Sequence, residues 1–281
     1  MQNQTALFLM TTETPEAALA EAAEQARISG TRLRCLVFAP IPTLPFNAYG
    51  GLPYAGAANS DGWPSLLDAA RNTLKDRADT FEQVLADANA SGGLRPVLAA
   101  IADLREHVTA SARTVDVAYI APELREEPEI FYEMVHAVLF HSPVGIVLNT
   151  SRMTPLKRVF VAWNDSPAAA RAVHAALPFL RAAEEVCIGC FDPSTVLDTD
   201  EEEPGADMAA WLSHSGCKVT LGQYPSGGNE IGSCVLQRAA ETGSELVVMG
   251  AYGHSRMRQA VFGGTTRTLL EQTEMPVLMA H

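Results

Sequence analysis

Glycines cluster in one stretch of the chain, where their spacing suits the binding of a phosphate group. This stretch spans residues 250–266 and reads GAYGHSRMRQAVFGGTT. The short apolar run before it, residues 246–249, is typical of a buried parallel strand, and residues 265–272 have a helical pattern. Glycine lets the backbone take positive φ or approach a ligand closely, and the N-terminus of a helix attracts anions. We therefore predict a phosphate-binding loop between a strand and a helix.

The spacing of these glycines matches neither of the two common phosphate motifs. The stretch lacks the lysine of a P-loop and does not contain GxGxxG. It resembles the nucleotide loop of the universal stress protein family, in which glycine, two residues, glycine, nine residues and glycine precede a small polar residue. Gly250, Gly253 and Gly263 occupy the three glycine positions, and Gly264 stands where the family has serine or threonine. The alternative is a glycine-rich turn that binds no ligand.

The resemblance implies that the loop holds the phosphates of ATP or a related adenine nucleotide, with Mg²⁺ as an optional companion. Backbone N–H groups would bind the phosphates, and the hydroxyls of Thr265 and Thr266 would assist. His254 would either meet a phosphate or point to water. Arg256 and Arg258 would either offset phosphate charge or be solvated.

Two polar residues after a second apolar run, 159–163, complete the expected site. The family places aspartate and then glycine here, near the ribose and base, whereas this chain has Asn164 and Asp165. Asn164 can still hydrogen-bond a hydroxyl. Asp165 adds a charge that would crowd or repel a nucleotide, or else it is an exposed residue of the turn. The predicted nucleotide-binding residues are Asn164, Asp165, Gly250, Gly253, His254, Gly263, Gly264, Thr265 and Thr266.

The elements that must position these residues occur twice along the chain. Residues 7–15, LFLMTTETP, align with residues 159–167, VFVAWNDSP, at a constant offset of 152, since 167 minus 15 is 152. The alignment continues without a gap to Cys35 against Cys187. Each copy predicts a strand, a Ser or Thr that can cap a helix, a proline at the first helical position and a second strand. We infer a duplicated domain.

Both halves continue as alternating strands and helices, which predicts parallel α/β sheets covered on both faces. The resemblance implies two Rossmann-like domains with five parallel strands each, at residues 1–151 and 152–281. In the family, two units pair through their last strands. We therefore expect residues 144–148 to pair with 277–279, so that one chain forms an intramolecular pseudo-dimer. Further homo-oligomerisation stays open.

The first half lacks the glycines of the second. No glycine lies between Ile120 and Leu139, and the strand ending at Ile120 is followed by APELREE. Glutamates at positions 123, 126, 127 and 129 would place negative charge where phosphates would sit. We expect the first half to be a structural or regulatory partner and the second half to be the nucleotide binder.

Composition excludes other classes of function. The formal net charge of −13 argues against a nucleic-acid partner. No apolar run is long enough to span a membrane, and the N-terminus lacks the pattern of a signal peptide, so we expect a cytoplasmic protein. The five cysteines fit free buried thiols, because Cys187 and Cys190 lie on one strand and face opposite sides.

We predict no catalytic residue and no metal site in the protein itself. No nucleophile–base arrangement and no metal-ligand spacing is present. The leading hypothesis is a universal stress protein that binds ATP in its second half and acts in stress-response signalling, with at most slow hydrolysis. The alternative is a stress-linked scaffold that binds no nucleotide and works through protein contacts. An adenylate-forming or hydrolytic enzyme would need a catalytic acid, base or lysine that the sequence does not show.

Overall fold

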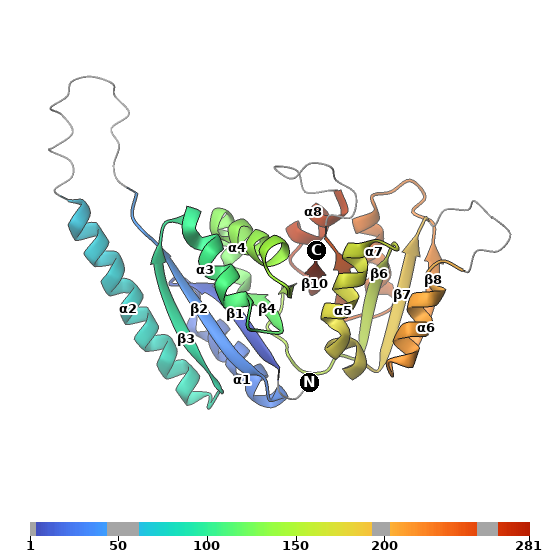
Figure 1. Ribbon diagram of the computed structural model, residues 1–281, viewed down its shortest axis with the longest axis horizontal. Helices are drawn as coiled ribbons and strands as arrows, with labels where there is room; N and C mark the ends of the chain where they lie inside the picture. The colour runs from blue at the N-terminus through green and yellow to red at the C-terminus, as the bar shows by residue number, and fades with distance from the viewer. Residues whose placement is uncertain (1–3, 44–61, 193–202, 252–263) are drawn as a thin grey trace, which may run out of the picture.

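The computed structural model describes residues 4–43, 62–192, 203–251 and 264–281. The described residues form one ten-stranded sheet with helices on both faces, as Figure 1 shows. The strands are β1 Thr5–Thr11, β2 Arg32–Pro40, β3 Gly92–Ala99, β4 Val117–Ile120, β5 Gly145–Leu148, β6 Arg158–Trp163, β7 Glu185–Phe191, β8 Val219–Tyr224, β9 Leu246–Gly250 and β10 Val277–Ala280. The helices are α1 Glu16–Ser29, α2 Trp63–Asp87, α3 Ile101–Ala112, the 3₁₀ helix η1 Pro122–Glu126, α4 Pro128–His141, α5 Pro167–Ala182, α6 Ala206–His214, α7 Ile231–Glu241 and α8 Gly264–Glu271.

The order of the strands repeats in the two halves and is reversed in the second. The sheet runs β3-β2-β1-β4-β5-β10-β9-β6-β7-β8, so β3 and β8 form its two far ends (Figure 1). Neighbouring strands within each half are parallel. This arrangement confirms the Rossmann-like α/β fold that was predicted from the sequence.

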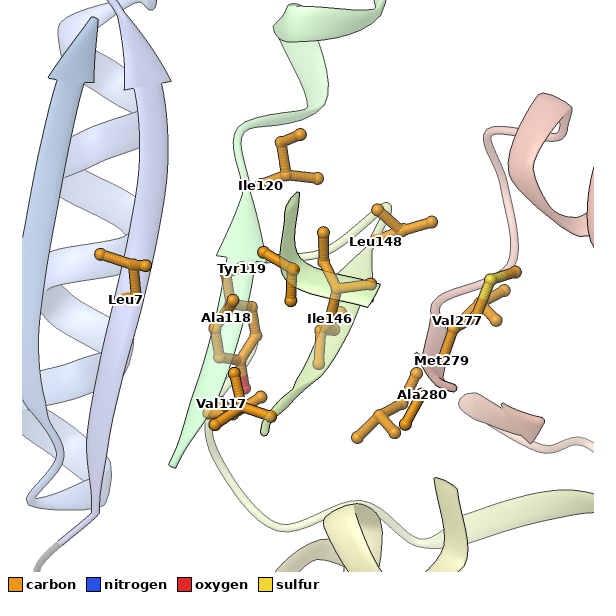
Figure 2. Packing of buried hydrophobic residues seen from close by; sticks show 14 of the residues in the cluster. Leu7, Val117, Ala118, Tyr119, Ile120, Ile146, Leu148, Val277, Met279 and Ala280 are labelled. Carbon is orange, nitrogen blue, oxygen red and sulfur yellow. The ribbon is translucent and has the colours of Figure 1, made fainter. Parts of the chain in front are cut away.

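The two halves meet through their last strands, as predicted. Strands β5 and β10 pair antiparallel, with Val277 opposite Leu148 and Met279 opposite Ile146. All four of these side chains are fully buried. Figure 2 shows them packed at the centre of the sheet. Because burying such a side chain contributes about 1.5–3 kcal/mol, this seam stabilises the contact between the halves.

The pairing of the first two strands also repeats between the halves. Phe8 lies opposite Cys35 and Phe160 opposite Cys187, a separation of 27 residues in each case, since 35 minus 8 and 187 minus 160 are both 27. The duplication inferred from the sequence is therefore visible in the strand register.

The helices that follow the first strands begin differently. Ser166 caps α5, because its hydroxyl oxygen accepts a hydrogen bond from the Ala169 N–H at 3.1 Å. The prediction that Thr14 caps the first helix is wrong. Its hydroxyl oxygen accepts from the Thr11 N–H at 3.1 Å, and Pro15 takes the N-cap position without a side-chain cap. The Thr14 hydroxyl therefore bonds to the end of β1 and not to the helix.

All five cysteines are free, as predicted, and four of them are buried. Burial raises the pKa of the Cys35 thiol to about 12. Burial, followed by the charges of Glu203 and Asp207, raises the pKa of Cys190 to about 11. These two thiols therefore stay protonated and unreactive at neutral pH.

Candidate functional site

The candidate site lies at the carboxyl ends of β6 and β9 in the second half. These two strands are neighbours, and strand order reverses between them, since β7 and β8 follow on one side and β10 lies on the other. Open parallel sheets bind ligands at such a switch point. The fold therefore brings the chain after β6 and the chain after β9 to one crevice.

Asn164 and Asp165 form the turn between β6 and α5, and both are exposed. Asn164 Oδ1 accepts a hydrogen bond from the Ser166 hydroxyl at 2.8 Å, and Asp165 has φ of 54°. The aspartate thus adopts the left-handed conformation that glycine takes easily, at a cost of about 1 kcal/mol. The turn therefore carries an exposed carboxylate at a backbone conformation that suits glycine.

Gly250 ends β9 and packs against the first turn of α5. A Cβ atom at this position would lie 2.3 Å from the Ala169 backbone nitrogen and 2.5 Å from the Ala168 carbonyl carbon. The sequence predicted that the loop's glycines serve positive φ or close approach to a ligand. At Gly250 the close approach is to helix α5, which explains this glycine without a ligand.

Helix α8 begins at Gly264, on the far side of the predicted loop. Gly264 is exposed, Thr265 is half-buried and Thr266 is 4% exposed. The free N–H groups in the first turn of a helix, together with its dipole, form an anion site. This end of α8 therefore has the chemistry that the sequence predicted for phosphate binding.

Part of the predicted site lies outside the described residues. Gly253, His254 and Gly263 belong to this part, as do the loop arginines at positions 256 and 258.

Glu230 stands beside the start of α8, and the sequence analysis missed it. Its carboxylate accepts hydrogen bonds from the N–H groups of Gly232 and Ser233, both at 2.8 Å, and so caps α7. Its Oε1 lies 3.8 Å from where a Cβ atom of Gly264 would be. The residue is exposed. A negative charge is therefore already present near the predicted phosphate position.

Hydrogen bonds hold this carboxylate in its ionised form. Burial alone would raise the pKa of Glu230, but the N–H groups of Gly232 and Ser233 and the hydroxyls of Thr268 and Thr265 lower it below its ordinary value. The neighbouring Asn229 donates from its amide Nδ2 to the Ser226 carbonyl at 2.9 Å, and Glu230 is the N-cap. In the sequence, the one signal for this cap was a glutamate directly before the apolar Ile231.

The glycines after β8 are explained by the turn that they form. Gly227 has φ of 62° and Gly228 has φ of 82°, a region that disfavours other residues. The Ser226 hydroxyl oxygen accepts a hydrogen bond from the Gly228 N–H at 3.1 Å. This turn alone accounts for both glycines.

The matching crevice of the first half is crossed by a hydrogen bond. The Thr11 hydroxyl at the end of β1 donates to Glu127 Oε1 at 2.6 Å, across the position that follows β4 and η1. Glu123 lies in η1 itself, and its Oε2 is buried without a hydrogen-bond partner among the described residues. Of the four glutamates expected to oppose phosphate binding, Glu127 is thus the one that bonds to the end of β1 at this crevice.

The first half also supports helix α8. Arg125 donates from Nη2 to Asn149 Oδ1 at 2.7 Å and from Nη1 to the Leu270 carbonyl at 2.5 Å. Asn149, with φ of 63°, donates from Nδ2 to the carbonyls of Gln272 and Met275 at 3.1 and 3.0 Å. Burial lowers the pKa of Arg125, which remains a cation. We call these two side chains the α8 brace, because they hold the C-terminal end of α8.

Two kinds of feature are not found among the described residues. They contain no group of three or more His, Cys, Asp or Glu side chains able to hold a metal ion. None of their helices has the length and apolar character required to cross a bilayer.

Comparison with known proteins agrees with this fold. Residues 228–281, which include α7, β9, α8 and β10, match the model of the universal stress protein family. No curated protein matches the sequence. The resemblance to universal stress proteins inferred from the sequence is thus confirmed, in a layout consistent with two tandem domains.

A solved structure shows the same architecture over nearly the whole chain. A universal stress protein from Archaeoglobus fulgidus DSM 4304 superposes with a TM-score of 0.65 at 14% identity, over 98% of this chain and 95% of that one. A universal stress protein from Lactobacillus plantarum matches at 12% identity, over 46% of this chain and 99% of that one, with a TM-score of 0.36. Another, solved in complex with cAMP, matches at 15% identity, over 41% of this chain and 74% of that one, with a TM-score of 0.26.

Proposed function

We propose that this universal-stress-type protein binds ATP or a related adenine nucleotide in its second half, and that nucleotide binding acts as a signal in the stress response. The observation that carries the proposal is the contrast between the two crevices. Thr11 and Glu127 bridge the crevice of the first half. In the second half the equivalent crevice is bordered by Asn164, Gly250 and the N-terminus of α8.

The described residues fit the phosphate end of a nucleotide. The first N–H groups of α8 would bind the phosphates, and the Thr265 hydroxyl would assist by exchanging its hydrogen bond to Glu230 for one to a phosphate. Asn164 would contribute its Nδ2 amide, for which the described residues provide no hydrogen-bond partner, since Ser166 engages Oδ1. Bound Mg²⁺ would neutralise phosphate charge. Glu230 is placed to meet such an ion near Gly264.

The remaining site assignments belong to the same proposal. Gly253, His254, Gly263 and Thr266 are proposed to complete the phosphate-binding part. Hydrolysis is expected to be slow, because no described residue of the crevice is positioned as a general base. The two halves, residues 1–151 and 152–281, are proposed to act as an intramolecular pseudo-dimer in the cytoplasm.

The proposal is tested by isothermal titration calorimetry with Mg–ATP on three proteins. Gly264→Glu adds a carboxylate at the start of α8 and should weaken binding at least about tenfold through repulsion of the phosphates. Gly62→Glu makes the same change at the N-cap of α2, where an added Cβ meets nothing within 4 Å, and should bind as the wild type does. Absent binding in the wild type, or equal binding in the Gly264 variant, would overturn the proposal.

The second candidate function is a scaffold that binds no nucleotide. Two observations favour it, the Glu230 carboxylate beside Gly264 and the exposed carboxylate of Asp165 at the opposite side of the crevice. Native mass spectrometry of the freshly purified protein distinguishes the two candidates. A co-purified adenine nucleotide favours the signalling function, whereas bare protein that also gives no heat with Mg–ATP favours the scaffold.

A further inference from the structure

A pocket at the outer edge of the first half is rich in arginine. It has a volume of about 200 Å³ and lies over β2 and β3, near the end of α3. Its lining includes Arg32 and Arg34 from β2, Arg95 and Gly93 from β3, and Ser111 from α3. Figure 1 shows β3 at the end of the sheet farthest from the second half. The lining from β2 and β3 comes from the amino-terminal parts of these strands, whereas both crevices lie at carboxyl ends, so the pocket is separate from them.

The arginines of this pocket are positioned by hydroxyl groups. Arg34 Nη1 donates to Thr114 Oγ1 at 2.5 Å, and Arg95 Nη1 donates to Ser111 Oγ at 2.9 Å. Neither contact neutralises charge. Among the described residues, Arg32, Arg34 and Arg95 form no ion pair with a carboxylate. In a protein of net charge −13, three arginines are thus gathered without an anionic partner.

The floor of the pocket is open. A Cβ atom built on Gly93 meets nothing within 4 Å, whereas one built on the neighbouring Gly92 would lie 1.7 Å from the Leu33 carbonyl oxygen. Gly92 is therefore required for the pairing of β3 with β2, and Gly93 leaves space above the strand. Because β3 is an edge strand of the described sheet, no other described strand pairs with its outer side.

The equivalent strands of the second half carry a different charge arrangement. A pocket of about 290 Å³ over β7 and β8 is lined by Arg158, Glu185 and Thr220 among others. Arg158 Nε lies 3.0 Å from Glu185 Oε2, so this arginine already has an anionic partner. The comparison shows that an unpaired arginine cluster is not a consequence of the fold.

We propose that the pocket over β2 and β3 binds a small phosphate-type oxyanion of the size of phosphate or pyrophosphate. Guanidinium groups bind such oxyanions through paired, charge-assisted hydrogen bonds. The volume is below that of pockets for drug-sized ligands, so a whole nucleotide does not fit. The Ser111 hydroxyl supplies a further hydrogen-bonding group. This site is independent of the proposed nucleotide site in the second half.

The test is calorimetric titration with pyrophosphate in phosphate-free buffer at low ionic strength. Arg34→Gln/Arg95→Gln removes two charges but keeps hydrogen-bonding groups, and it should weaken binding about tenfold or more. Gly93→Asp places a carboxylate in the open floor and should weaken binding to a similar extent, because the added negative charge repels the anion. Arg158→Gln is the matched control from the second half, and its affinity should equal that of the wild type.

Circular dichroism establishes that each variant is folded before titration. Binding in the wild type that is lost in either first-half variant and kept in Arg158→Gln supports the site. No binding in the wild type, or unchanged binding in a folded first-half variant, would overturn it. Loss in Arg158→Gln as well as in the first-half variants would also contradict it, because the anion would then not be specific to this pocket.

Discussion

In the first half, Glu127 reaches across the crevice to Thr11, and a 3₁₀ helix follows β4 directly. In the second half, the corresponding strands end at an exposed turn and at Gly250, and α8 presents its N-terminus nearby. The sheets that carry these ends have the same order and the same pairing of their first strands. The difference therefore arises in the segments after the strands, which is where α/β folds vary their function.

The halves also depend on each other. Arg125 follows β4 in the first half, yet its guanidinium binds the Leu270 carbonyl at the end of α8. The segment that occupies the first crevice thus supports the helix that forms part of the second. The α8 brace therefore links the segment after β4 in the first half to helix α8 in the second.

The largest expected effect comes from Gly250→Ala, which tests whether the second crevice needs its close packing. The added methyl group would lie 2.3 Å from a backbone nitrogen of α5, so β9 or α5 must move. We expect a loss of about 2–3 kcal/mol in the free energy of unfolding, measured by urea denaturation. Gly62→Ala, where the methyl group meets nothing, is the control. Equal stability of the two variants would show that the packing of Gly250 is unimportant.

Arg125→Ala tests the link between the halves. It removes the hydrogen bonds to Asn149 and to the Leu270 carbonyl, which we expect to cost about 2 kcal/mol. Hydrogen exchange should become faster in the peptide that covers α8. Arg71→Ala removes an exposed pair with Asp68 and should change neither quantity measurably. Unaltered exchange in α8 would mean that the brace does not hold this helix.

Asp165→Gly sharpens the comparison at the opposite side of the second crevice. Glycine adopts the positive φ of 54° at this position without strain, so we expect the free energy of unfolding to rise by about 1 kcal/mol. Removal of the carboxylate should tighten the binding of Mg–ATP. Asn89→Gly relieves a similar φ of 51° in the first half and should change stability alone. Thermal denaturation and calorimetry measure the two effects. Unchanged nucleotide affinity in Asp165→Gly would remove this residue from the site.

The smallest effect is expected from Glu230→Gln, and it depends on pH. The folded protein holds the pKa of Glu230 below its ordinary value, so the stabilisation by the carboxylate is complete above the unfolded pKa and is lost as pH falls through the lower, folded pKa. Loss of the charged cap should cost about 0.5–1 kcal/mol at neutral pH. The difference between wild type and variant should vanish in acid. A difference that persists unchanged at low pH would contradict the role of the charge.

Much of the fold could be predicted because the duplicated sequence and the local strand and helix patterns indicate the same architecture. The alignment of residues 7–35 with 159–187 required two similar units, and the strand patterns indicated parallel sheets. The pairing of the last strands followed from the family resemblance. Ser166 was predictable as a cap because serine before proline is a local signal.

The features that the sequence did not reveal depend on contacts between distant segments. Glu230 matters because Gly232 lets α7 approach α8, so that a capping carboxylate comes to lie beside Gly264. Arg125 and Leu270 are 145 residues apart, and no local pattern joins them. Gly250 was correctly selected as a special position, but its constraint is the packing of α5.

The number of nucleotides bound per chain tests the central claim most directly. Native mass spectrometry at saturating Mg–ATP should show one adenine nucleotide per chain in the wild type and none in Gly264→Glu. This result is expected because, in the part of the chain that the structure describes, the second half has an exposed turn after β6 and the N-terminus of α8, whereas Glu127 bonds to Thr11 in the first half. Three results would contradict the claim that only the second half binds nucleotide. They are two nucleotides per chain, none in the wild type, and one that persists in Gly264→Glu.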